Sequence, residues 1–151
     1  MARFKWFSAA VLLAASVSAA PRADSTQIMQ QFAGQQGLVF AGSEQDTDGG
    51  LWAYRFEPSA ACTQNCMPLT VYFSKTQEQC VGEPDLFGEI PLNINGREAL
   101  FSSPKLTDKL AQASDYITVD AGDGWCYSVS YGTKGSHFKV AQQLASWLVG
   151  K

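Results

Sequence analysis

The dipeptide Asn95-Gly96 separates two short runs rich in apolar residues, residues 90–94 and 97–101. A two-residue turn of type I′ needs positive φ angles at both central positions, and Asn followed by Gly adopts them at low cost. The segment therefore predicts a tight β-hairpin. Because a hairpin joins antiparallel neighbours, this dipeptide favours an antiparallel sheet over a parallel one.

A second hairpin is predicted between residues 116–120 and 125–131, which flank the tetrapeptide Ala-Gly-Asp-Gly at residues 121–124. Successive side chains of a strand point to opposite faces, so Trp125 and Tyr127 share a face with the apolar residues that follow them. We expect this aromatic face to lie in the core.

A short apolar run predicts a strand at residues 38–41, and apolar alternation predicts two more, at residues 52–57 and 69–74. A polar loop is expected at residues 42–50. The longest loop is expected at residues 75–89, where glycine, proline and acidic residues replace any periodic pattern.

Helices are expected at both ends of this strand-rich region. Ser25 is a candidate N-cap for a first helix that ends at Gly37, and Ser103-Pro104 is a candidate start for a short helix that stops near Ala113. A final amphipathic helix should follow Ser136 and end at Gly150. The predicted fold is α+β: a single antiparallel sheet of five to seven strands, packed by N- and C-terminal helices, in one domain over residues 21–151.

Residues 1–20 have the layout of a secretory signal peptide. Arg3 and Lys5 precede an apolar run over residues 6–17, and small residues follow at 18–20. The apolar run is too short to cross a bilayer, and no later stretch is long and apolar enough to do so. We therefore expect a periplasmic or secreted protein whose mature chain has no membrane span.

The chain has 4 cysteines, Cys62, Cys66, Cys80 and Cys126, all beyond the predicted leader. An even number of cysteines in an exported domain predicts disulfides, and the sequence leaves three pairings open. We favour Cys62–Cys66 within a loop and Cys80–Cys126 over a long range, because Cys126 lies in a predicted strand and cannot easily serve both neighbours. Two disulfides should then cross-link the domain.

Composition excludes several classes of protein. With 46% hydrophobic and 17% charged residues, the chain can build a core and is not a disordered tail. It has 11 Lys and Arg against 14 Asp and Glu, a formal charge of −3. A nucleic-acid partner is therefore not expected, because phosphate binding needs a concentrated basic face.

Two thiols one helical turn apart, Cys62 and Cys66, with the thioether of Met67 beside them, are soft ligands suited to copper(I). This spacing is similar to the C-x-x-x-C copper loop of Sco-type copper chaperones and of the binuclear copper domain of cytochrome oxidase. The resemblance implies His137 as a distal ligand. Copper handling is thus the alternative to a structural disulfide, which we favour and which needs no cofactor.

Other chemistry is predicted to be absent. Glu44, Asp46 and Asp48 have the alternating acids of a calcium loop, but Arg55 stands where the bidentate glutamate belongs. Ser136-His137 with Asp120 or Asp123 does not form a recognisable nucleophile motif, and the acids Glu83, Asp85 and Glu89 are expected to be a solvated loop. No set of residue types meets the requirements of a catalytic site, so we expect no enzymatic activity.

Binding remains as the expected activity. Leu86 and Phe87 lie beside Glu83 and Asp85 in the longest loop, and they either fill the core or form an apolar contact with a charged rim. Residues 93–99 and 125–129, with the closing helix, resemble the layout of small exported α+β domains of bacterial lipoproteins and envelope sensors. The resemblance implies a scaffold for binding a protein or another envelope or extracellular component.

Overall fold

The structure is a computed structural model that describes residues 21, 24–63, 66–75, 80, 85–105, 114–132 and 137–150. These residues form two helices and seven strands. In chain order the elements are α1 (Ser25–Gln35), β1 (Leu38–Gln45), β2 (Leu51–Pro58), β3 (Leu69–Ser74), β4 (Phe87–Ile94), β5 (Arg97–Pro104), β6 (Tyr116–Gly122), β7 (Trp125–Tyr131) and α3 (Phe138–Val149).

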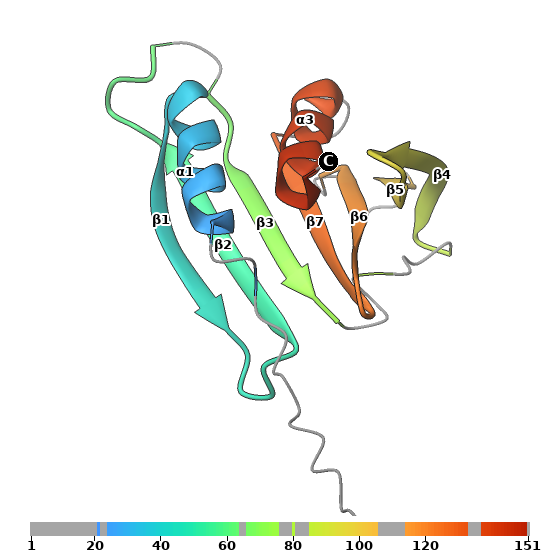
Figure 1. Ribbon diagram of the computed structural model, residues 1–151. Helices are drawn as coiled ribbons and strands as arrows, with labels where there is room; N and C mark the ends of the chain where they lie inside the picture. The colour runs from blue at the N-terminus through green and yellow to red at the C-terminus, as the bar shows by residue number, and fades with distance from the viewer. Residues whose placement is uncertain are drawn as a thin grey trace, which may run out of the picture.

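All seven of these strands belong to one sheet, in the order β1-β2-β3-β7-β6-β5-β4. Every pair of neighbours is antiparallel. Both helices lie on one face of the sheet, which we call the helix face: α1 lies over β1 and β2, and α3 over β7 and β6 (Figure 1). The prediction of an α+β fold with one antiparallel sheet and helices from both ends of the chain is confirmed.

The core lies between the helix face and the two helices. Val71 and Val129 are Cα partners in β3 and β7, and both are fully buried, as is Leu144 of α3. Phe73 stacks on Trp125 with ring centroids 4.6 Å apart. The aromatic side of β7 is therefore core, as its alternation predicts.

The Asn95-Gly96 hairpin is confirmed, with φ angles of 53° and 80° at the two turn residues. The amide Nδ2 of Asn95 also reaches α3, where it lies 3.1 Å from the carbonyl oxygen of Ser146, 2.9 Å from its hydroxyl and 2.7 Å from the carbonyl oxygen of Gly150. Turn geometry and side chain together attach the β4–β5 hairpin to the end of the last helix.

The second hairpin is also confirmed, with a shorter turn than the sequence suggests. Asp123 and Gly124 have φ angles of 56° and 79°, and β6 continues to Gly122 rather than ending at residue 120. The pairing slips between Asp120 and Gly122, so the extra residues are absorbed in a bulge.

Residues 42–45 are strand, which corrects the prediction of a loop over residues 42–50. Ser43, Glu44 and Gln45 pair with Tyr54, Ala53 and Trp52 after a bulge between Phe40 and Gly42. β1 is an edge strand, so polar side chains are tolerated there, and a polar sequence did not reveal the pairing. Only residues 46–50 form the turn.

Two further predictions are corrected together, because the segments concerned pair with each other. Phe87 and Gly88, expected in the long loop, are the Cα partners of Pro104 and Ser103, which were expected to begin a helix. Lys105 N donates to Leu86 O at 2.9 Å and closes this end of the ladder. The remaining residues of the expected helix, 106–113, lie outside the described residues.

The helix ends differ slightly from prediction. Asp24, not Ser25, is the N-cap of α1, and Ser25 is buried in the first turn. His137 is the N-cap of α3, while Ser136 lies outside the described residues. Gly150 ends α3 with a φ of 69°, as predicted.

Both preferred disulfides are confirmed. Cys62 bonds Cys66 with Cα atoms 6.2 Å apart, and Cys80 bonds Cys126 with Cα atoms 5.6 Å apart. The second bond ties the segment between β3 and β4 to the face of β7 that points away from the helices, which we call the far face. The predicted leader, residues 1–20, lies outside the described residues, and no helix among those described is long and apolar enough to span a bilayer.

Candidate binding surface

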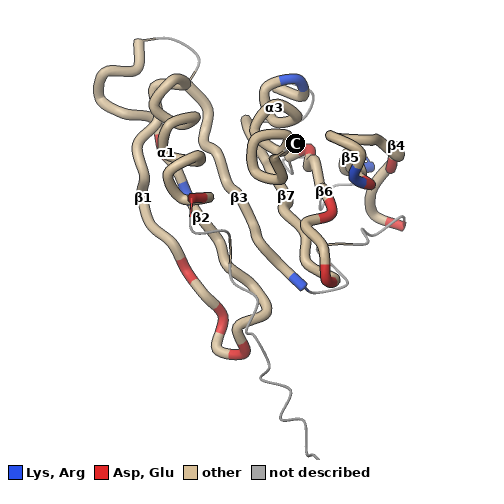
Figure 2. Tube along the Cα trace, viewed as in Figure 1, with Lys and Arg blue, Asp and Glu red and all other residues tan. Residues whose placement is uncertain are grey.

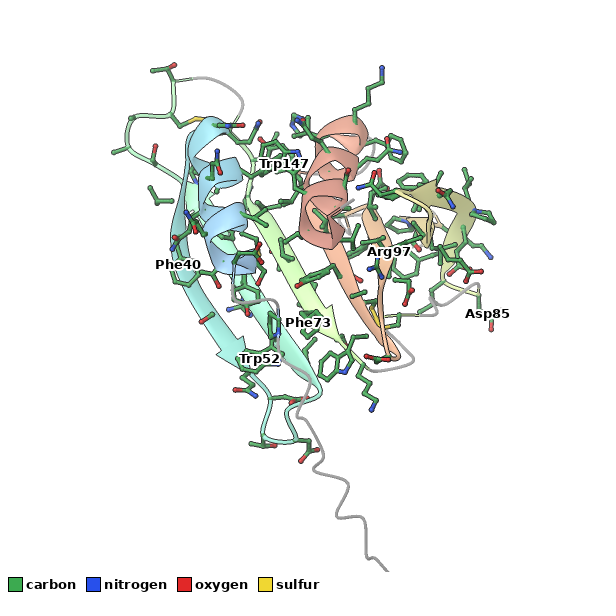
Figure 3. All side chains as sticks on the ribbon, in the orientation of Figure 1. Phe40, Trp52, Phe73, Asp85, Arg97 and Trp147 are labelled. Atoms are coloured by element: carbon green, nitrogen blue, oxygen red, sulfur yellow. A yellow bond between two sulfur atoms is a disulfide. The ribbon has the colours of Figure 1, made fainter. Side chains whose placement is uncertain are left out.

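The four residues of the predicted contact do not share one environment. Leu86 is 44% exposed, and Asp85 is exposed and points away from the sheet (Figure 3). Phe87 is partly buried and packs edge-on against Tyr116, with ring centroids 6.2 Å apart. Glu83 lies outside the described residues. Leu86 is therefore at the surface, whereas Phe87 packs against the sheet.

Ile90, which sequence reasoning placed in the hairpin without a functional role, is 55% exposed. It lies in β4, the strand at one edge of the sheet, and its Cα partner is Phe101. Phe101 packs against Phe138 of α3 with ring centroids 4.9 Å apart. Leu86 and Ile90 are four residues apart in the sequence, and we call these two exposed apolar side chains together the β4 surface.

The opposite edge of the sheet also carries exposed apolar side chains. In β1, Val39 is 51% exposed and Phe40 is 43% exposed. The ring of Phe40 lies edge-on to Phe56 of β2, with centroids 5.5 Å apart, and Figure 3 shows it at the outer margin of the sheet. Among the described residues, the exposed large apolar side chains therefore sit at or next to the two free edges.

The four residues of the copper hypothesis form a disulfide or pack against other side chains of the protein. The sulfur atoms of Cys62 and Cys66 are bonded to each other, and Cys66 and Met67 pack against the core. His137 lies against Tyr131, with ring centroids 4.6 Å apart. Within the residues that the structure describes, no group of three His, Cys, Asp or Glu side chains is arranged to hold a metal ion.

The acids of the calcium-like loop also have partners within the protein. Both carboxylate oxygens of Glu44 accept hydrogen bonds from the guanidinium of Arg55, at 3.0 and 3.1 Å. Asp46 Oδ1 accepts a hydrogen bond from Gly50 N at 2.8 Å, inside the turn between β1 and β2. These carboxylates stabilise the β1–β2 hairpin.

His137 does not lie beside Asp120 or Asp123, because they are near opposite ends of β7. Asp120 lies near the end of β6 and Asp123 in the β6–β7 turn, whereas His137 follows the other end of β7. There it lines a cavity of about 10 Å³ together with Asp115 and Tyr131, a volume that suits at most one water molecule. Burial raises the pKa of Tyr131 above its usual value.

The far face carries a set of buried hydroxyl groups that sequence reasoning missed. Thr118 and Ser128 are Cα partners in β6 and β7, and their hydroxyl oxygens are 2.9 Å apart. The alternation that placed aromatic residues on the helix face also placed serines on the other, but it did not indicate that both faces are buried. The buried hydroxyl side chains on this face are Ser74, Ser102, Thr118, Ser128 and Ser130.

Comparison with family models, with curated proteins and with solved structures found no match to this chain.

Proposed function

We propose that this chain is an exported bacterial binding protein, periplasmic or secreted, that binds a protein or another component of the envelope or the extracellular space and has no catalytic activity. Two features support export. Residues 1–20 have the layout of a signal peptide, and both disulfides belong to the class of cross-link that persists in oxidising compartments.

The exposure of Leu86 and Ile90 is the observation that carries the binding role. Covering the exposed half of an aliphatic side chain of this size contributes about 1 kcal/mol, so two of them supply an anchor of moderate strength. Asp85 adds a charge at the rim. Cys80, six residues before Leu86, is joined to β7 by its bond to Cys126.

Site-specific photocrosslinking tests the proposal. A photoreactive amino acid replaces Leu86 in the oxidised chain, which is then mixed with envelope extract or culture supernatant and irradiated. We expect an adduct of defined mass. The matched control carries the same amino acid at Gln143, an exposed polar position on α3, and should give no such adduct.

Competition makes the result specific to the β4 surface. An excess of the unmodified chain should abolish the adduct, whereas an excess of the L86S/I90S variant should not. Equal competition by both chains, with both showing the same thermal unfolding, would overturn the assignment of this surface.

Copper handling through Cys62, Cys66, Met67 and His137 remains the alternative hypothesis, and a thiol count on the native chain separates the two. The binding proposal expects no reactive thiol. A copper site requires Cys62 and Cys66 in the reduced form, because thiolates are the soft ligands that copper(I) prefers.

A further inference from the structure

The two edges of the sheet differ in their capacity to accept another strand. β4 contains Pro91 in its middle, at an exposed position, and proline has no N–H to donate to a neighbouring strand. β1 has no proline in its eight residues. Its bulge between Phe40 and Gly42 confines regular pairing to the residues on either side. Residues 42–45, after the bulge, pair regularly with β2, and so do residues 38–40, the part before it.

The register of β1 against β2 indicates which backbone groups of this part face outward. Gly37 O accepts a hydrogen bond from Ser59 N at 2.9 Å, so Gly37 points towards β2. In an antiparallel pair, residues alternate between pointing towards the partner strand and away from it. Leu38 and Phe40 consequently direct their N–H and C=O groups away from β2. Leu38 is nearly fully buried, whereas Phe40 is 43% exposed, so it is Phe40 that presents these groups at the open edge.

The exposed side chains of this edge point to both faces of the sheet. Phe40 lies on the helix face beside Phe56. Val39 lies on the far face, where its Cα partner is the exposed Glu57. A strand added here would cover both apolar side chains at once, in addition to completing the backbone hydrogen bonds.

The charge around the β1 edge is acidic. Arg55 is held by Glu44, whereas Glu57, Asp46 and Asp48 have no basic partner in the described residues. Figure 2 shows the acidic positions along the lower part of β1 and in the β1–β2 turn. On the far face, a shallow depression of about 310 Å³ is lined by Glu44, Arg55 and Glu57, with the small residues Gly42 and Ala53 among its walls.

From these observations we propose that the edge of β1 binds an extended peptide segment of another protein as an eighth strand, and that this segment alternates apolar and basic side chains. Apolar side chains would contact Phe40 on the helix face. Lysine or arginine side chains would lie on the far face, where their stems cover Val39 and their charges meet Glu57. This surface is distinct from the β4 surface. Pairing with a second copy is disfavoured, because it would bring two acidic edges together.

A defined peptide tests the proposal with the intact, oxidised chain. The probe is an eight-residue peptide of alternating Val and Lys, the length of β1. Two control peptides match it: one has the same residues in two blocks, and one is N-methylated at alternate residues, which removes hydrogen-bond donors. We expect saturable binding of the alternating peptide, at least about tenfold weaker binding of both controls, and weakening by salt.

Two variants of the chain locate the site. Val39→Lys introduces a basic residue beside Glu57 and should weaken binding at least about tenfold, because it repels the peptide and blunts the edge. Gln143→Lys places the same charge at an exposed position on α3 and should leave binding unchanged. A variant that unfolds is recognised by its thermal transition, and in that case Glu57→Gln replaces Val39→Lys with the expectation of a smaller dependence on salt.

Hydrogen exchange gives a second, independent measurement on the wild-type chain. On adding the peptide, the amide of Phe40 should exchange more slowly, while that of Val39, which points towards β2, should not change. No binding at millimolar peptide, equal binding of the block peptide, insensitivity to Val39→Lys with the fold intact, protection at β4 instead, or dimerisation of the chain through β1 would each overturn the proposal.

Discussion

Asn95 and Asp123 occupy equivalent positions in the two hairpin turns, with φ angles of 53° and 56°, but they differ in what their side chains do. The amide of Asn95 reaches three oxygen atoms at the end of α3. No contact of this kind is formed by Asp123 within the described residues. The two turns therefore allow the backbone conformation to be separated from the tertiary hydrogen bonds.

Replacing Asn95 with glycine should lower the free energy of unfolding by about 1–2 kcal/mol, because glycine retains the positive φ but removes the hydrogen bonds to Ser146 and Gly150. Urea unfolding followed by tryptophan fluorescence measures the change. The matched variant Asp123→Gly should stay within about 0.5 kcal/mol of the wild type. A loss of the same size in both variants would contradict the role assigned to the Asn95 side chain.

Single residues also mark the limit of what the sequence could predict. The turn chemistry of Asn95-Gly96 is local, so the hairpin followed directly from it. Whether Leu86 or Phe87 would be exposed depended on the register between β4 and β5, and no local sequence pattern indicates how far that pairing extends. Ile90 was missed for a similar reason: the sequence placed it in a hairpin strand, but its exposure depends on how the sheet and the last helix pack.

At the scale of elements, the two disulfides close loops of very different length, with sequence separations of 46 and 4 residues. On the chain-entropy account, the longer loop contributes about 4 kcal/mol to stability and the shorter about 2 kcal/mol. Two double variants, C80A/C126A and C62A/C66A, compare them directly by urea unfolding. The first should lose clearly more stability, and an equal or larger loss in the second would show that loop length does not dominate.

The elements that the sequence misassigned are those at edges and ends. Residues 42–45 are polar because β1 has solvent on one side, and polarity alone suggested a loop. Ser103-Pro104 has the residue types of a helix start, yet Pro104 is nearly fully buried opposite Phe87 at the end of β5. Local preference was overridden there by the pairing with β4.

For the molecule as a whole, three tyrosines make stability depend on pH in the alkaline range. Burial raises the pKa of Tyr54, Tyr116 and Tyr131 above the usual 10.0, and the neighbouring Tyr72 adds to the effect at Tyr116. The unfolded chain therefore releases these protons first. Their contribution is fully present below about pH 10 and is lost as the pH rises above it.

Urea unfolding between about pH 9 and pH 11 should show a falling free energy of unfolding, and Tyr116→Phe should make the fall shallower because one of the three groups no longer titrates. Short incubations keep the disulfides intact. A wild-type stability that stays level across this range, or a fall of the same slope in the Tyr116→Phe variant, would show that burial does not hold the protons on these tyrosines.

The sequence predicted an antiparallel sheet of five to seven strands, but it did not predict the order of the strands in the sheet. Hairpins link neighbours along the chain, and they account for β1-β2-β3 and for β4-β5-β6-β7. The contact between Val71 and Val129 that joins these two meanders connects residues far apart in sequence. Both strands are apolar on the same face, and no local signal indicates that they are partners.

The pairing of β3 with β7 determines when the hydrophobic core can close. During synthesis β1, β2 and β3 are available for pairing before β7 is. Leu69, Val71 and Phe73 of β3 then have a partner strand on only one side until β7 pairs with them. β7 is the last of the described strands to be synthesised, and the core closes only once β7 has paired with β3.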